Sequence, residues 1–213
     1  MHHPAGDDDL VLLANDDITF ESDFISNAVH AIGRVPRGLL GARTRDPESG
    51  VIHETGVNAD LRKFVFRIAD QSEQINCLPT RALMLRWSDM RQIGGFHPRL
   101  LPHYWADYEY TIRASRKGFR CFTSDDVVIT ENPHTTGDRD LDSSVGLELV
   151  RRLFSVKTPW NPVYRTAFAV LASAGMWKIV NVVNIWARAL FRLIWQGVLL
   201  RKFPRKHLPR AAS

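Results

Sequence analysis

Oxygen-bearing side chains follow a short apolar run near the start of the chain. Leu10–Leu13 is apolar without interruption and leads into Asn15, Asp16 and Asp17. Such a run is typical of a buried strand in a parallel sheet that is covered on both faces. Ligands of open α/β sheets gather beyond the carboxyl ends of the strands, where oxygen donors suit Mg²⁺ or Mn²⁺. The alternative is a turn that caps the next helix, because Asn and Asp are common turn residues.

A second pair of carboxylates opens a helix that we expect from Ala106 to Lys117, closed by Gly118. Asp107 and Glu109 are two residues apart and would point about 200° away from each other. Only one of them can therefore face a given ligand. If Asp107 faces a cleft, the helix N-terminus would keep it ionised, and it could accept a proton from a substrate hydroxyl within hydrogen-bond reach. The alternative is an ordinary acidic residue of a first helical turn.

The pattern of apolar residues predicts the elements that position these groups. Helical spacing over 22–34 predicts a helix, with Ser22 as its expected N-cap. A further short helix is expected near 88–93. Residues 58–73 are ambiguous and are expected to be rich in loops. From about 147 onward the chain is expected to be mainly helical, interrupted by Pro159 and Pro162. Strands are expected at 10–13, 39–42, 50–57, 119–122 and 127–130. This alternation favours an α/β layer architecture.

The charge of the chain is divided unevenly along its length. The net charge is +5, yet the last acidic residue is Glu148, and residues 149–213 carry twelve Lys and Arg. The basicity belongs to a C-terminal tail, so it does not indicate binding of nucleic acid. Cys77 and Cys121 are too few for a disulfide framework, and no secretory signal opens the sequence. Both observations favour a reducing cytosol.

The tail contains polar residues at a mean step of about 3.6, the period of an α-helix. The residues between them are apolar and include Trp186 and Trp195, and Trp177 directly precedes the first polar position. Three charges within the window argue against a spanning helix. We expect a helix that lies on an anionic membrane surface; packing on the enzyme core or on a partner chain is the alternative. The polar positions are Lys178, Asn181, Asn184, Arg188, Arg192 and Gln196.

Four segments follow one another in the order seen in a known family of enzymes. They are LVLLANDDITF, CLPTRALMLRWSDMRQIGGF, HYWADYEYTIRASRKGF and VVITENPH, spread over residues 8–137. In this respect the chain resembles family 2 glycosyltransferases of the GT-A fold, and most of all bacterial rhamnosyl- and galactofuranosyl-transferases. The resemblance implies an α/β GT-A type (Rossmann-like) mixed sheet over residues 1–146. A basic tail of amphipathic helices over 147–213 would follow it.

The resemblance also implies roles for residues at the metal motif. Asp17 matches the metal-binding Asp of the Asp-x-Asp motif, which would hold Mg²⁺ or Mn²⁺. Asn15 stands where the first Asp of that motif often is, and Asp16 fills the variable middle place. His134 lies where some members supply a further metal ligand. Arg81 is a candidate for contact with the phosphates of the donor.

For catalysis, Asp107 matches the acidic residue that deprotonates the acceptor hydroxyl in this family. Ala106 occupies the position where the family usually has Glu, so Glu109 is the fallback for the base. The expected function is an inverting transfer of a sugar from a nucleotide-sugar to a glycan or lipid-linked acceptor in the synthesis of cell-envelope polysaccharide. The expected location is cytoplasmic, peripheral on the inner face of the cell membrane.

Two other functions remain open. In the family, roughly 90 residues precede the metal motif and form the nucleotide pocket. That is the length that two or three α/β units require. Nine residues precede Leu10. We therefore expect an incomplete N-terminal part and, as the alternative function, a non-catalytic remnant that binds a membrane or a partner. A metal-dependent phosphohydrolase is disfavoured, since further His or Asp ligands for a two-metal centre are not apparent.

Overall fold

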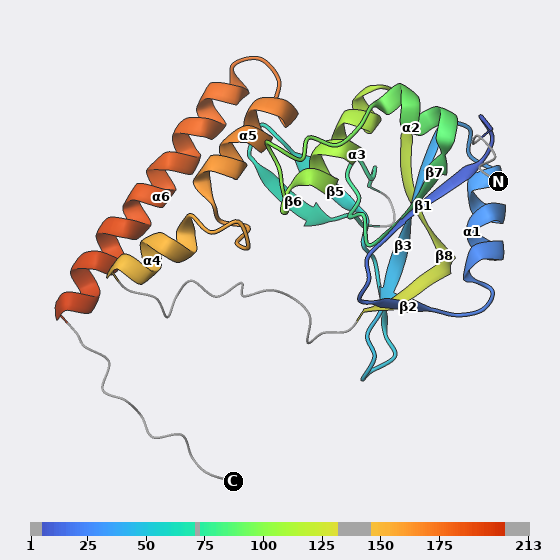
Figure 1. Cartoon of the computed structure of the whole chain (residues 1–213), viewed down its shortest axis with the longest axis horizontal. Helices are drawn as coiled ribbons and strands as arrows, with labels where there is room; N and C mark the ends of the chain where they lie inside the picture. Colours follow the sequence, from blue (N-terminus) through green and yellow to red (C-terminus); the bar gives the residue numbers. More distant parts are fainter. Residues whose placement is uncertain (1–5, 71–72, 132–145, 203–213) are drawn as a thin grey trace, which may run out of the picture.

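The computed structural model describes residues 6–70, 73–131 and 146–202. In this part of the chain the protein is α/β, with a mixed six-stranded sheet and several helices (Figure 1). The strands lie in the order β1 (Leu10–Ala14), β7 (Ala82–Arg86), β3 (Gly38–Arg45), β8 (Arg120–Glu131) and β2 (Ile18–Phe20), with β4 (Ile52–His53) beside β3. β3 and β8 are parallel, and the other pairs are antiparallel. The α/β class and the mixed sheet are confirmed.

The first strand differs from its expected setting. β1 pairs antiparallel with β7, with Leu10 opposite Arg86 and Ala14 opposite Ala82, and it lies at an edge of the sheet. The expectation of a parallel neighbour is therefore wrong. Coverage of both faces is correct, because Leu12 packs against one core and Leu13 against the other. An uninterrupted apolar run reports this two-sided burial and carries no information on the direction of the neighbouring strand.

Helices cover both faces of the sheet. α1 (Phe24–Gly33) buries Phe24, Ala28 and Ile32 on one face. α2 (Trp87–Ile93) and α3 (Ala106–Arg116) pack on the other face (Figure 1). Adjacent residues of β3 enter different cores, as alternation along a strand requires. The expected N-cap of the first helix is wrong by one residue, since Asp23 occupies that place and makes no side-chain cap hydrogen bond.

Three strand predictions need correction. Residues 58–73, expected to be ambiguous and rich in loops, also contain strand: β5 (Val57–Asp60) and β6 (Val65–Ile68) form an antiparallel hairpin. The Asn76 side chain holds this hairpin, accepting from the N–H of Ala59 and donating to its carbonyl. The two strands expected at 119–122 and 127–130 are one strand, β8, with an irregular register opposite Gly41–Arg43. Within 50–57, only β4 (Ile52–His53) and Val57, the first residue of β5, belong to strands that pair with a neighbour.

The C-terminal helices are α4 (Gly146–Leu153), α5 (Pro162–Ala172) and α6 (Trp177–Lys202). Asn161 caps α5, since its side chain accepts from the backbone N–H of Val163 at 2.9 Å, and Pro162 takes the first helical position. Phe168 of α5 is fully buried against the hairpin and α3. The helical tail therefore shares a core with the rest of the chain. In the described residues, none of the helices is long and apolar enough to cross a membrane.

Candidate functional site

A cavity of about 600 Å³ opens where β1 and β8 end and α3 begins. We call it the carboxylate cavity; its polar lining includes Asn15, Asp17, Arg81, Asp107 and Glu131. The backbone N–H of Asn15 donates to the carbonyl of Arg81 at 2.9 Å and so extends the β1–β7 pairing by one residue. Glu131 lies opposite Ile18 at the end of the β8–β2 ladder. Strand pairing therefore brings together residues that are more than a hundred positions apart.

Arg81 and Glu131 form an ion pair in this cavity, at 2.9 Å between Nη1 and Oε2. Both side chains are partly buried. The resemblance did not assign Glu131, although Glu131 lies within the quoted segment VVITENPH. Its signal in the sequence was its place at the end of an apolar strand, where ligands of α/β sheets gather. The pairing holds the Arg81 guanidinium at the wall of the cavity.

Asp107 lies in the first turn of α3 and faces the carboxylate cavity. Its Oδ1 accepts a hydrogen bond from the backbone N–H of Tyr108 at 2.8 Å. Burial raises the pKa of the Asp107 carboxyl above its ordinary value of 3.8, although backbone N–H groups and the charge of Arg81 lower it. The ionised carboxylate is therefore more basic than an exposed Asp and better suited to accept a proton.

Trp105, the residue before α3, holds a backbone conformation that is uncommon for a bulky side chain. Its φ of 74° lies in the left-handed region. Its indole N–H donates to the carbonyl of Pro159 at 3.0 Å, and its ring packs against Phe66 and Phe168. Such a conformation costs about 1–3 kcal/mol and persists only where the surroundings impose it. The packing of Trp105 thus fixes the start of α3 and, with it, the position of Asp107.

Glu109 points away from the carboxylate cavity, as the helical geometry predicted. It is 3% exposed, and its two carboxylate oxygens accept from Arg113 at 2.8 and 3.0 Å. Arg113 also donates to the carbonyls of Ile93 and Gly95. Glu109 is not among the residues that line the cavity. Its place supports a structural role and removes the geometric basis for it as the fallback base.

The other predicted site residues fall in different places. Asn15, Asp17 and Arg81 line the carboxylate cavity together with Asp107. Asp16 is exposed and lies outside the lining. His134 lies outside the described residues, so its predicted role as a metal ligand stays a prediction.

The donor set of the carboxylate cavity fits a partial shell for a divalent ion. Residues 6–70, 73–131 and 146–202 contain no cluster of three or more His, Cys, Asp or Glu that would hold a metal by themselves. Mg²⁺, however, takes one or two protein carboxylates and completes its octahedron with water and substrate phosphates. The carboxylate of Asp17 and the amide oxygen of Asn15 are hard donors of the required kind. These two residues would hold Mg²⁺ or Mn²⁺.

No protein-family model matches the chain, and no curated protein matches it. The chemistry of the carboxylate cavity therefore rests on its own residues: a basic carboxylate, oxygen donors at a strand end and an arginine held by ion pairing.

Proposed function

We propose that the chain is the metal- and acceptor-binding portion of an inverting glycosyltransferase. It would move a sugar from a nucleotide-sugar to a glycan or lipid-linked acceptor of the cell envelope. One observation carries the proposal: Asp17, Arg81 and Asp107 lie around a single cavity of about 600 Å³. That volume suits a small-molecule ligand. The three groups supply a metal ligand, a cation for phosphate and a proton acceptor.

In the proposed reaction, Asp107 accepts the proton of the acceptor hydroxyl. The hydroxyl oxygen attacks the anomeric carbon of the donor and forms the glycosidic bond with inversion. The bond between that carbon and the diphosphate oxygen breaks, and the diphosphate takes the electron pair. Arg81 contacts the diphosphate from the cavity wall. A bound Mg²⁺ or Mn²⁺ supplies further charge that offsets the departing anion.

Aromatic rings beside Asp107 offer a surface for a sugar. Tyr104 stacks on His103 with ring centroids 4.6 Å apart, and both residues line the cavity. Trp105 is already enclosed by Phe64, Phe66 and Phe168, so its ring serves packing. Tyr104 is therefore the better candidate for contact with the acceptor, because an aromatic ring at the wall of the cavity can pack on the apolar side of a sugar.

The proposed location is the inner face of the cell membrane, with α6 lying on an anionic surface. The apolar side chains along this helix are exposed, with Ile179 at 70% and Phe191 at 63%. Asn181 is buried and donates to the carbonyl of Leu61, so part of the polar stripe faces the protein. This orientation leaves the broad apolar side outward, where a lipid surface can cover it.

A non-catalytic module that binds a membrane or a partner is the second candidate. It is favoured by the exposed apolar side of α6 and by the free edge of β1, which pairs only with β7 among the described strands. An unpaired strand edge is a template for a further strand. The two candidates differ at Asp17, which only the enzyme needs.

Calorimetric titration with Mn²⁺ and a panel of nucleoside diphosphates tests the proposed function. Wild type should bind a nucleoside diphosphate only with the metal, and Asp17→Asn should lose this binding, because the carboxylate is a metal ligand. Asp16→Asn is the matched control, since Asp16 is exposed and outside the cavity. Equal binding by wild type and Asp17→Asn, or no metal-dependent binding at all, would support the non-catalytic module.

A further inference from the structure

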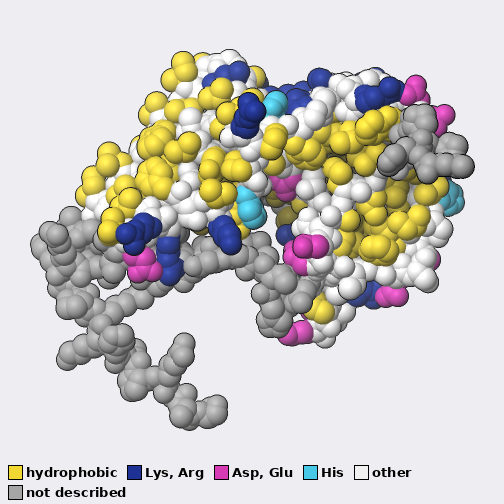
Figure 2. Space-filling view, in the orientation of Figure 1, with side chains coloured by type: hydrophobic (Ala, Val, Ile, Leu, Met, Phe, Trp, Pro, Cys, Tyr) yellow, Lys and Arg dark blue, Asp and Glu magenta, His cyan; other side chains and the backbone are white. Residues whose placement is uncertain are grey.

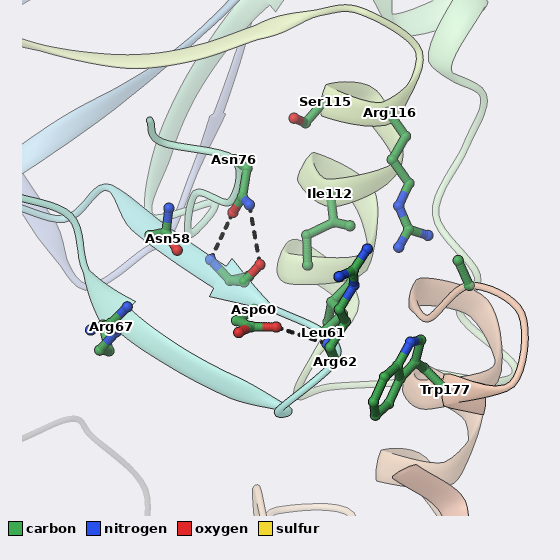
Figure 3. Close-up of a pocket in the computed structure, with 12 residues that line it drawn as sticks. Asn58, Asp60, Leu61, Arg62, Arg67, Asn76, Ile112, Ser115, Arg116 and Trp177 are labelled. Atoms are coloured by element: carbon green, nitrogen blue, oxygen red, sulfur yellow. Dashed lines mark hydrogen bonds between the residues drawn. The ribbon is translucent and has the colours of Figure 1, made fainter. Parts of the chain in front are cut away.

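A second cavity, of about 520 Å³, lies between the β5–β6 hairpin, the end of α3 and the start of α6 (Figure 3). It shares no lining residue with the carboxylate cavity. We call it the arginine cavity, since Arg62, Arg67 and Arg116 line it together with Asp60 and Trp177. Figure 3 shows Arg116 descending from α3 toward Arg62 and Trp177, with Arg67 on the neighbouring strand of the hairpin. None of the roles assigned above uses these residues.

The arginine cavity has an excess of positive charge. Among the described residues, no carboxylate lies within ion-pair distance of Arg62, Arg67 or Arg116. Asp60 is the one acidic lining residue. Its Oδ1 accepts from the backbone N–H groups of Arg62 at 2.9 Å and Lys63 at 3.2 Å, so it serves the hairpin turn. Three arginines therefore line the space, with one carboxylate to offset their charge.

Hydrogen bonds hold the walls of this cavity in place. Asn76 bonds both the N–H and the carbonyl of Ala59, and Asn58 donates to the carbonyl of Gln74 at 3.0 Å. From the other side, buried Asn181 donates to the carbonyl of Leu61 at 2.7 Å. The first turns of α6 are thus fastened to the hairpin beside Arg62. The arrangement is preorganised, which reduces the entropy lost when a ligand binds.

We propose that the arginine cavity binds the phosphate group of an anionic ligand. The planar fork of each guanidinium matches two oxygens of a phosphate, and several forks can converge on one group. Trp177 forms an apolar wall beside them. Met176, directly before α6, and Ile179, two residues after Trp177, are 67% and 70% exposed and begin the apolar surface along α6. A phospholipid headgroup is therefore the source of phosphate that the surface favours; a free phosphate is the other source.

Two matched triple variants of the full chain test this site. Arg62→Gln/Arg67→Gln/Arg116→Gln removes the cavity arginines, all exposed at the surface. Arg34→Gln/Arg99→Gln/Arg120→Gln removes the same charge from exposed positions outside the cavity. Each protein is titrated with inorganic phosphate and with phosphatidylcholine vesicles that contain phosphatidic acid. The cavity variant should bind both about tenfold more weakly than the control variant, since charge-assisted hydrogen bonds are lost.

The two probes separate the sources of phosphate. Weaker binding of vesicles and of inorganic phosphate by the cavity variant supports a lipid headgroup in the cavity. Weaker binding of inorganic phosphate alone supports a site for free phosphate. Equal affinities of the two triple variants for both probes would overturn the proposal. Thermal unfolding checks that the cavity variant folds; if it does not, Arg67→Gln against Arg120→Gln makes the same comparison with single changes on strands.

Discussion

Asp107 is the carboxylate whose surroundings best suit proton transfer. It lies in the first turn of α3, faces the carboxylate cavity and accepts a hydrogen bond from the backbone N–H of Tyr108. Glu109, two residues further on, is buried and paired with Arg113. The two carboxylates have different surroundings because residues two apart on a helix point to nearly opposite sides of it. Replacing Asp107 with Asn should therefore remove the ionisable carboxyl and the proposed proton transfer, with little effect on the packing of α3.

The raised pKa of Asp107 makes the stability of Asp107→Asn depend on pH. Below the unfolded-state pKa the Asp107 carboxyl is protonated in both states and its burial carries no charge-desolvation cost. As pH rises from there through the higher folded-state pKa, the wild type loses stability, because the unfolded state gives up the proton more readily than the native state. The Asn variant lacks this loss. Denaturant unfolding should show Asp107→Asn to be the more stable protein at pH 7, with a smaller gap at pH 4. A gap that is constant with pH, or reversed at pH 7, contradicts this prediction.

At the scale of elements, Arg113 joins α3 to the end of α2 and to the turn that follows it. Arg113 pairs with Glu109 on its own helix and donates to the carbonyls of Ile93, the last residue of α2, and Gly95. Gly94 has a φ of 91°, which favours glycine. This turn and Arg113 set the separation between α2 and α3, and so the start of the loop that leads to the carboxylate cavity.

Arg113→Ala should lower the free energy of unfolding by roughly 3 kcal/mol, because it leaves the Glu109 carboxylate buried without its partner. Chemical denaturation gives the measurement, and Arg120→Ala, an exposed arginine of β8, is the control. Adding Glu109→Gln to Arg113→Ala should restore part of the loss, since the uncompensated charge is then absent. A loss under about 1 kcal/mol for Arg113→Ala would show that the pair is not a structural link.

At the scale of the whole molecule, the C-terminal helices carry a broad apolar surface on one side of the protein. Figure 2 shows hydrophobic side chains gathered over α4–α6, with a separate apolar area over the sheet. Along α6 the large apolar residues Val183, Leu190 and Ile194 are all more than half exposed. An apolar surface of this extent indicates a lipid or protein partner.

Val183→Ser/Leu190→Ser/Ile194→Ser should reduce binding to anionic liposomes about a hundredfold or more, because each apolar side chain contributes about 1.5–3 kcal/mol when buried. The control is Ile25→Ser/Val29→Ser on α1, where both residues are also exposed. Cosedimentation at low and high salt measures binding, and salt should weaken only its electrostatic part. Wild type that fails to sediment with liposomes at low salt would favour a protein partner.

The features that the sequence predicts well depend on neighbours a few residues away. The helix from Ala106 ends where Gly118 was expected to close it, and Gly118 has a φ of 83°. The helix α5 begins at Pro162, where an interruption of the C-terminal part was expected. Helical periodicity and capping are local, so residue types within one or two turns suffice to predict them.

By itself the sequence thus determined the α/β class, the main helices and the opposite orientations of Asp107 and Glu109 on α3. Only the tertiary structure decided that β1 is an antiparallel edge strand, that residues 57–68 form a hairpin and that Glu131 meets Arg81. The arginine cavity also appears only in three dimensions, since its walls come from the hairpin, α3 and α6. Each of these depends on pairing between segments far apart in the chain, and a period-2 pattern specifies a buried face without specifying the partner.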